Sequence, residues 1–251
     1  MARSPGREIV PPVQKLRMRY AKRGRMRFAS HRDCARSFER ALRRVGVPMA
    51  FSAGFHPHPK ISYANAVPTG TSSEAEYLEI GVLQECDPQA LQAALNATLP
   101  DGMEIMDVVV TRTSDLATRL EAGEWRLELP GIEPDVARAA AQAFLAVDEV
   151  EVQRMTKGGL RRFDARGPVV ELAECSGEGD PEGCAILRLV VRHGTPSVRP
   201  DDILAALAAV ADLAPPIPPR ITRLAQGPLD ENARTVQDPL LPDRVEPTVG
   251  A

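Results

Sequence analysis

Residues 15–45 read KLRMRYAKRGRMRFASHRDCARSFERALRRV and combine two different periodicities. Leu16, Met18 and Tyr20 alternate with basic residues, which is the period-2 pattern of a half-buried strand. Phe28 continues the apolar phase beyond a glycine turn. The pattern therefore predicts that a strand opens the fold and that Tyr20 and Phe28 both pack in the core.

Ser30 marks the change from strand to helix periodicity. Its hydroxyl can cap a helix, and Asp33 places a carboxylate in the first turn, where it suits the helix dipole. Gly46 and Pro48 then end the helix. The apolar stripe comprises Cys34, Phe38, Ala41, Leu42 and Val45. The arginines that fall off this stripe are Arg36, Arg40, Arg43 and Arg44.

The first half of the chain continues with strand and helix signals in a regular order. Residues 49–52 and 60–67 have extended character, and residues 76–83 form a clearer strand pattern. A helix is predicted from 87 to 99, opened by an aspartate followed by proline, and a strand from 103 to 110. The resulting order, β-α-β-β-α-β, is that of a ferredoxin-like domain.

The second half repeats this order more loosely. Strands are predicted at 124–129, 185–192 and 220–224, helices at 133–147 and 199–213, and a strand or hairpin group over 150–174. The predicted fold class is α+β, with two tandem ferredoxin-like (βαββαβ) domains. The predicted boundaries are 1–12 for a disordered N-terminus, 13–112 for a basic domain, 123–226 for an acidic domain and 227–251 for a disordered tail.

The net charge of −3 conceals a strong asymmetry. Residues 1–60 carry 15 Lys and Arg against three acidic residues, whereas the other 191 residues carry 16 basic and 31 acidic side chains. The first segment is therefore +12 and the remainder −15. Such a concentration of positive charge favours a polyanion partner over a merely solvated surface.

The composition also limits the compartment and the cofactors. The sequence has no apolar run long enough to span a membrane, and its first twelve residues lack the apolar core of a signal peptide. The cysteines Cys34, Cys86, Cys175 and Cys184 include no Cys-x-x-Cys pair. We therefore expect a cytoplasmic protein with free thiols, no membrane association, and no metal or other cofactor.

The densest motif lies between residues 17 and 78. It contains RMRYAK at 17–22, FASHRD at 28–33, FERALRR at 38–44, FSAGFHPHPK at 51–60 and SSEAEY at 72–77. The combination resembles the radical-SAM-linked protein family, a domain of unknown function found alone or fused to the C-terminal side of B12-binding radical SAM proteins. The resemblance covers roughly residues 13–210 and is loose in the second half. It departs from the commoner pattern at Arg32, where a leucine is expected.

The resemblance implies association with a radical SAM enzyme, not that chemistry itself. The chain has no Cys-x-x-x-Cys-x-x-Cys motif, so a radical SAM protein would act in trans. RNA, such as tRNA or rRNA, is the other partner that we expect, because guanidinium groups suit phosphate oxygens. The residues predicted to bind it are Arg17, Arg19, Lys22, Arg23, Arg25, Arg36, Arg40, Arg43, Arg44, Phe55, His56 and Lys60.

The histidines suggest two further hypotheses, a catalytic pair and a metal site. His31 and His56 could act as a general acid and base in RNA cleavage if the fold brings them together. A metal site formed by His56, His58 and a carboxylate such as Glu74 or Glu76 is disfavoured, because the proline between the two histidines sends their side chains to opposite sides.

The sequence as a whole predicts an RNA-binding accessory protein linked to a radical SAM or RNA-modification system, and more a binding protein than an enzyme. Two alternatives remain open. One is a metal-independent endoribonuclease that uses His31 and His56. The other is a module that docks a radical SAM partner through its basic face.

Overall fold

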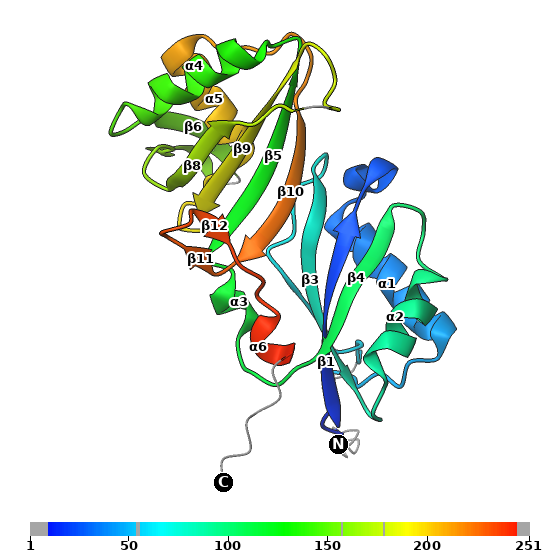
Figure 1. The fold of residues 1–251 in the computed structure, drawn as a ribbon. Helices are drawn as coiled ribbons and strands as arrows, with labels where there is room; N and C mark the ends of the chain where they lie inside the picture. Colours follow the sequence, from blue (N-terminus) through cyan, green and yellow to red (C-terminus); the bar gives the residue numbers. More distant parts are fainter. Residues whose placement is uncertain (1–9, 54–55, 157, 178, 245–251) are drawn as a thin grey trace. The chain divides into compact units, whose positions relative to one another are not determined.

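The computed structural model describes residues 10–53, 56–156, 158–177 and 179–244 (Figure 1). The chain forms two compact units. The first unit combines Met1–Ala117 with Leu240–Ala251, and the second is Thr118–Pro239. The chain thus leaves the first unit, builds the second and returns. Both units mix helices and strands, as the sequence predicts.

The first unit has the element order β-α-β-β-α-β. Its elements are β1 (Gln14–Lys22), the 3-10 helix η1 (Gly24–Phe28), α1 (His31–Val45), β2 (Ile61–Ala64), β3 (Ser72–Val82), α2 (Pro88–Asn96) and β4 (Met103–Val110). The strands of this unit lie in the order β4-β1-β3-β2, and each neighbouring pair is antiparallel. The predicted strand at 103–110 agrees with β4, whereas 49–52 contributes only isolated bridges.

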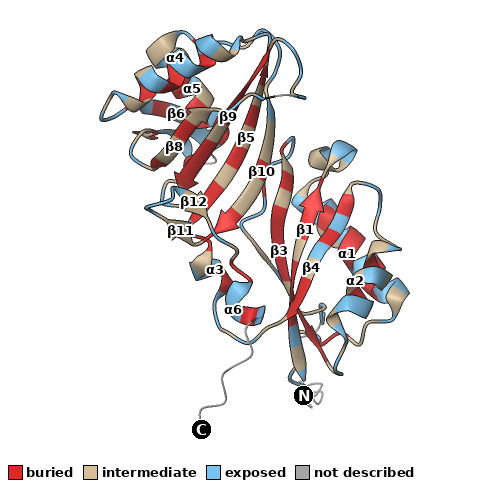
Figure 2. Cartoon of the chain, in the orientation of Figure 1, coloured by how far each residue is buried: buried red, intermediate tan, exposed pale blue. Residues whose placement is uncertain are grey.

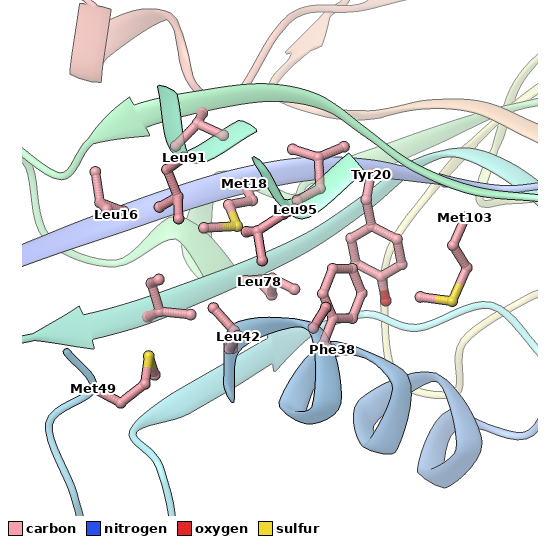
Figure 3. Close-up of a cluster of buried hydrophobic side chains, with 14 of the residues drawn as sticks. Leu16, Met18, Tyr20, Phe38, Leu42, Met49, Leu78, Leu91, Leu95 and Met103 are labelled. Carbon is pink, nitrogen blue, oxygen red and sulfur yellow. The ribbon is translucent and has the colours of Figure 1, made fainter. Parts of the chain in front are cut away.

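The core of the first unit lies between this sheet and the two helices α1 and α2 (Figure 3). Leu16, Met18 and Tyr20 all face it from β1, as their alternation predicts. The Tyr20 ring meets Phe38 of α1 edge-on, with ring centroids 4.7 Å apart. Aromatic edge-to-face pairs of this kind add to the stabilisation from buried apolar area.

Helix α1 begins and ends at the residues that the sequence indicates. The Ser30 hydroxyl accepts a hydrogen bond from the Asp33 amide at 3.2 Å and donates one to the Asp33 carboxylate at 2.7 Å. Gly46 ends the helix with φ of 76°, a left-handed conformation that glycine adopts without steric cost. Buried and exposed residues alternate along α1 and α2, so that each helix turns one side to the core (Figure 2).

The segment between β1 and α1 departs from the sequence prediction. The strand does not resume after Gly24; instead, the chain forms the single 3-10 turn η1. Met26 donates to the Arg23 carbonyl at 3.0 Å and Ala29 to the Met26 carbonyl at 2.9 Å, so local bonds replace a sheet ladder. As a result Phe28, expected in the core, is 60% exposed. Period-2 alternation over so few residues does not distinguish a strand from a tight turn.

The second unit follows the same scheme with an added hairpin. Its elements are β5 (Ala122–Pro130), α4 (Pro134–Leu145), β6 (Glu151–Thr156), β7 (Gly159–Asp164), β8 (Val169–Glu174), β9 (Cys184–Arg192), α5 (Pro200–Ala211) and β10 (Arg220–Gly227). The strands lie in the order β10-β5-β9-β8. Strands β6 and β7 pair with each other as a separate antiparallel hairpin. The short helix α3 (Leu116–Arg119) precedes β5.

The predicted disorder from residue 227 onward is wrong for the residues that the structure describes. They form β11 (Leu229–Asp230), β12 (Thr235–Val236) and α6 (Leu241–Arg244). Leu240 is fully buried, and Asp243 lies buried against the first unit. A proline-rich, polar composition misled the sequence prediction, because a few specific contacts are enough to order the segment. Residues 1–9 and 245–251, also expected to be disordered, lie outside the described residues.

Asp243 anchors the returning segment through four hydrogen bonds. Its carboxylate accepts from the Arg17 guanidinium at 2.7 Å, the Arg112 amide at 2.9 Å, the Thr113 amide at 3.0 Å and the Thr113 hydroxyl at 2.6 Å. Burial raises the pKa of this carboxyl, but these bonds and the Arg17 charge outweigh burial and hold the pKa at about 2. In the described residues, no helix is long and apolar enough to cross a membrane.

Candidate functional site

A groove with a volume of about 650 Å³ runs beside α1 on the first unit. It is lined by Met26, Ala29, Asp33, Arg36, Ser37, Arg40, Ala41, Arg44, Thr98 and Pro100. Most of these residues belong to α1. The others come from the turn that precedes α1 and from the loop that follows α2. The groove therefore lies at the edge of the first unit's helical layer.

Three arginines follow one another along this groove. Arg36, Arg40 and Arg44 are four residues apart, so each stands about 6 Å further along the axis of α1. Arg36 approaches Asp33 at 3.9 Å, and Arg40 donates to the Ser37 hydroxyl at 3.1 Å. Within the described residues, neither Arg40 nor Arg44 forms an ion pair. Their charges are thus available to a ligand.

The charge of α1 is strongly positive. Its acidic residues are Asp33 and Glu39, and its arginines are Arg32, Arg36, Arg40, Arg43 and Arg44, which gives the helix +3. A hydrogen bond from the Ser30 hydroxyl lowers the pKa of Asp33, the single acid among the groove's described lining residues, so this carboxylate is ionised at neutral pH. Repulsion between like charges at i,i+4 spacing destabilises a helix, so this arrangement has an energetic cost.

An exposed aromatic residue, Phe28, lies in the turn before α1 and is not among the residues that line the groove. Phe28 lies in the chain between Met26 and Ala29, which both line the groove. The Arg27 guanidinium stacks on the Phe28 ring, 4.6 Å from its centroid. Leaving a phenylalanine exposed forgoes about 1.5–3 kcal/mol of burial free energy. The sequence pattern placed Phe28 in the core, so its exposure was not predicted.

Four of the predicted RNA-binding cations are committed elsewhere in the fold. Arg17 is 2% exposed and pairs with Glu79 at 2.9 Å as well as with Asp243. Lys22 is buried and donates to a backbone carbonyl at 2.9 Å. No phosphate can reach the guanidinium of Arg17 or the ammonium of Lys22 in this arrangement.

Arg19 and Arg23 also make internal contacts. Arg19 donates to the Glu74 carbonyl at 2.8 Å. Arg23 bonds both carboxylate oxygens of Glu74, at 2.7 and 2.5 Å, and pairs with Glu104 at 2.5 Å. These bonds raise the pKa of Arg23 and keep it fully charged. Both residues tie the start of β3 at Glu74 to the end of β1 and the turn that follows it.

The predicted cations outside this row of three arginines do not line the groove. Arg25 and Arg43 are exposed, and neither is among the residues that line the groove. Lys60 is half-buried at the end of the loop that carries His56. Phe55 lies outside the described residues. Of the twelve predicted binding residues, the structure gathers Arg36, Arg40 and Arg44 into one groove.

The two histidines of the cleavage hypothesis occupy different local environments. His31 opens α1, and its ring meets Tyr63 edge-on with centroids 4.9 Å apart. His56 is exposed in a loop closed by hydrogen bonds between Ser52 and His58. Neither histidine is among the residues that line the groove. Burial raises the pKa of Tyr63, so this phenol is neutral at physiological pH.

The carboxylates considered for a metal site are engaged in other contacts. Glu74 is paired with Arg23, and Glu76 is buried and accepts a hydrogen bond from the Val67 amide at 3.1 Å. Among the described residues, no three His, Cys, Asp or Glu side chains come together as a metal-binding group.

These features define a class: a mixed α/β chain of two units, the first of which carries a cationic groove. Within that class, the chain belongs to the DUF2344 family of uncharacterized proteins conserved in bacteria, whose model matches residues 15–200. No curated protein matches the chain. The encapsulated DyP-type peroxidase from Mycobacterium smegmatis, solved by cryo-EM, is 12% identical and aligns over 90% of this chain and 94% of its own, with a TM-score of 0.23. A TM-score this low carries no argument about fold or chemistry.

Proposed function

We propose that the protein binds RNA through the groove beside α1. The observation that carries this proposal is the row formed by Arg36, Arg40 and Arg44. Two of these arginines have no ion-pair partner among the described residues, and the row is present despite like-charge repulsion along the helix. Guanidinium groups bind phosphate oxygens through paired hydrogen bonds, and the release of counterions from the nucleic acid adds to the affinity.

The role that fits this binding is that of an accessory protein. The resemblance to the radical-SAM-linked family suggests that the first unit holds an RNA, such as a tRNA or rRNA, for a radical SAM enzyme supplied in trans. The strand orders β4-β1-β3-β2 and β10-β5-β9-β8 support a ferredoxin-like assignment for both units. Because fold alone does not define function, the groove and not the fold carries the proposal.

The test is the salt dependence of RNA binding by a charge-reversal variant. The variant carries Arg36→Glu, Arg40→Glu and Arg44→Glu; glutamate is as good a helix former as arginine. A matched control carries Arg161→Glu, Arg162→Glu and Arg220→Glu, three exposed arginines of the second unit. Both variants change the net charge by the same amount, so a difference between them reports the location of the charge.

We expect wild type and control to bind a bulk tRNA preparation with an affinity that falls steeply as salt rises. The groove variant should bind weakly, and the slope of log affinity against log salt should shrink by about 2, because three phosphate contacts are lost. Absence of wild-type binding at low salt, or equal loss in both variants, refutes the proposal. RNA recovered after incubation should be intact; cleavage that His31→Ala or His56→Ala abolishes would favour the endoribonuclease alternative.

A further inference from the structure

We propose that His193 is a pH-sensitive switch in the second unit. The neutral ring ties the end of β9 to the residues before β5, and the protonated ring turns into a neighbouring cavity. Every residue involved belongs to the second unit, so the switch does not depend on RNA binding by the first. The other three histidines of the sequence lie between residues 31 and 58, which makes His193 the single histidine of the second unit.

The Nδ1 atom of His193 is fixed by the backbone. It lies 2.7 Å from the Leu120 carbonyl oxygen, and the His193 amide donates to the Glu121 carbonyl at 2.7 Å. A carbonyl oxygen only accepts, so Nδ1 carries a proton and Nε2 of the neutral ring does not. The two bonds tie the residue after β9 to the residues just before β5, the strand that neighbours β9 in the sheet (Figure 1).

The surroundings of Nε2 disfavour a second proton. A methyl group at Gly123 would lie 3.1 Å from His193 Nε2 and 2.9 Å from Trp125 Nε1, so both nitrogens border the same small space. The Trp125 N–H group is a donor, buried and without an acceptor among the described residues. Arg223, whose guanidinium lies over the Trp125 ring, is 3% exposed. Protonation would therefore add a second donor and a second buried positive charge.

These surroundings lower the pKa of His193 below the usual value for histidine. Burial is the largest cause, because it penalises the charged ring, and the positive charge of Arg223 acts in the same direction. The hydrogen bond at Leu120 opposes both but does not outweigh them. Protonation of the ring in its present position is thus unfavourable, and a second ring position becomes advantageous at acidic pH.

A cavity of about 510 Å³ beside the ring suits the charged form. Its charged lining residues, besides His193, are Glu121, Glu231 and Arg192. Arg192 pairs with Glu231 at 2.5 Å, and Glu121 accepts a hydrogen bond from the Leu229 amide at 3.1 Å. Two carboxylates against one guanidinium give this lining a charge of −1, which an imidazolium neutralises.

Rotation into the cavity loosens the junction between β5 and β9. It breaks the hydrogen bond to Leu120, whereas the backbone bond to Glu121 remains. Because the pKa of His193 is lower in the folded protein than in the unfolded chain, neutral His193 stabilises the folded state at high pH. This contribution is present above about pH 6.5, the unfolded value, and is lost as the pH falls below it.

The experiment measures the urea midpoint of the second unit at about pH 8 and about pH 5.5, the range in which histidine titrates. The readout is the emission of Trp125, the single tryptophan of the sequence. The test variant is His193→Asn, whose side-chain amide keeps a donor for Leu120 but takes up no proton. The control is His56→Asn, an exposed histidine of the first unit. Carboxyl titrations are common to all these proteins and cancel in the comparison.

We expect the midpoints of the wild type and of His56→Asn to shift to lower urea concentration at the acidic pH, and His193→Asn to lose this shift. An unchanged wild-type midpoint, or an equal shift in His193→Asn, overturns the proposal.

NMR spectroscopy separates rotation of the ring from protonation in place, and it needs no substitution of His193. The Nδ1 proton should give a signal at the higher pH that disappears at the lower one. Glu121→Gln keeps an acceptor for the Leu229 amide but removes one carboxylate from the cavity, so it should move this change to lower pH. A signal that persists at acidic pH, or a change that Glu121→Gln leaves at the same pH, contradicts the switch.

Discussion

The two units share a scheme of elements but differ in the surface of their first helix. In the first unit, α1 carries five arginines against two acidic residues. In the second, the corresponding helix α4 carries a single arginine, Arg138, which is neutralised by both Asp135 and Glu174. The buried sides are alike, because each helix inserts one phenylalanine, Phe38 or Phe144, into its core.

The comparison separates what the fold requires from what it leaves open. Packing against a sheet requires an apolar stripe, and both helices have one. The fold places no requirement on the outer face, where the arginine of α4 is paired with two carboxylates and where Arg40 and Arg44 of α1 form no ion pair within the described residues. The row on α1 is therefore not required by packing, which agrees with the binding role proposed for the first unit.

The largest predicted effect concerns the buried sides of α1 and α4, which should contribute about equally to the stability of their units. Phe38→Ala and Phe144→Ala should each lower the free energy of unfolding by about 4 kcal/mol, because each leaves a cavity in a closed core. Urea titrations measure this, with far-UV ellipticity for both units and Trp125 emission for the second. A cost below about 1 kcal/mol for either variant would show that the helices do not anchor their units in the same way.

A smaller predicted effect concerns the buried ion pair between Arg17 and Asp243. This contact is not part of the element scheme that the two units share. Asp243→Asn removes the charge paired with the buried Arg17, and should cost about 3 kcal/mol. Amide hydrogen exchange at Arg112 and Thr113 should accelerate, because both amides donate to this carboxylate. Asp230→Asn, at the end of β11 in the second unit, removes no charge pair among the described residues and should cost less than about 1 kcal/mol.

The same carboxylate gives the first unit an acid sensitivity. The pKa of Asp243 is about 2 in the folded protein and near 3.9 in an unfolded chain. A depressed pKa stabilises the folded state above the unfolded value, so this contribution is complete above about pH 5 and is lost as the pH falls from 4 to 2. In Asp243→Asn that part of the acid titration should disappear; an unchanged acid midpoint would contradict the role of this contact.

The smallest predicted effect is a gain in stability, whereas most substitutions destabilise a protein. Arg40→Glu replaces two like-charge neighbours, Arg36 and Arg44, with two opposite-charge pairs, and should stabilise the first unit by about 0.5 kcal/mol. The same substitution should weaken RNA binding. A thermal melt and a binding titration on one preparation test both statements. If the variant is destabilised, the row of arginines is a structural feature and the contrast with α4 loses its meaning.

The regular elements were largely predictable from the sequence. Ser30 and Gly46 mark the two ends of α1, because helix capping depends on residues next to each end. The alternation of Leu16, Met18 and Tyr20 placed β1 correctly. Helical spacing also identified Arg36 and Arg40 as off-stripe residues. These predictions succeed because the information lies within a few residues of each position.

The failures concern interactions between distant segments. Arg17 and Arg23 were predicted to face a ligand, but their partners Asp243 and Glu74 lie far away in the sequence. Phe28 was assigned to the core because a short alternating pattern does not reveal a turn. The order of residues 227–244 likewise depends on Asp243 contacts that composition cannot show.

The return of α6 to the first unit has a consequence for synthesis on the ribosome. Chains are made at about 5–20 residues per second, so that roughly ten seconds pass between the emergence of β4 and that of Asp243. Throughout this time, the N-terminal half holds Arg17 with only one of its two carboxylate partners. A chain truncated before Asp243 lacks the carboxylate that pairs with Arg17 in the complete unit. The first unit is thus complete only after the chain has been made as far as Asp243.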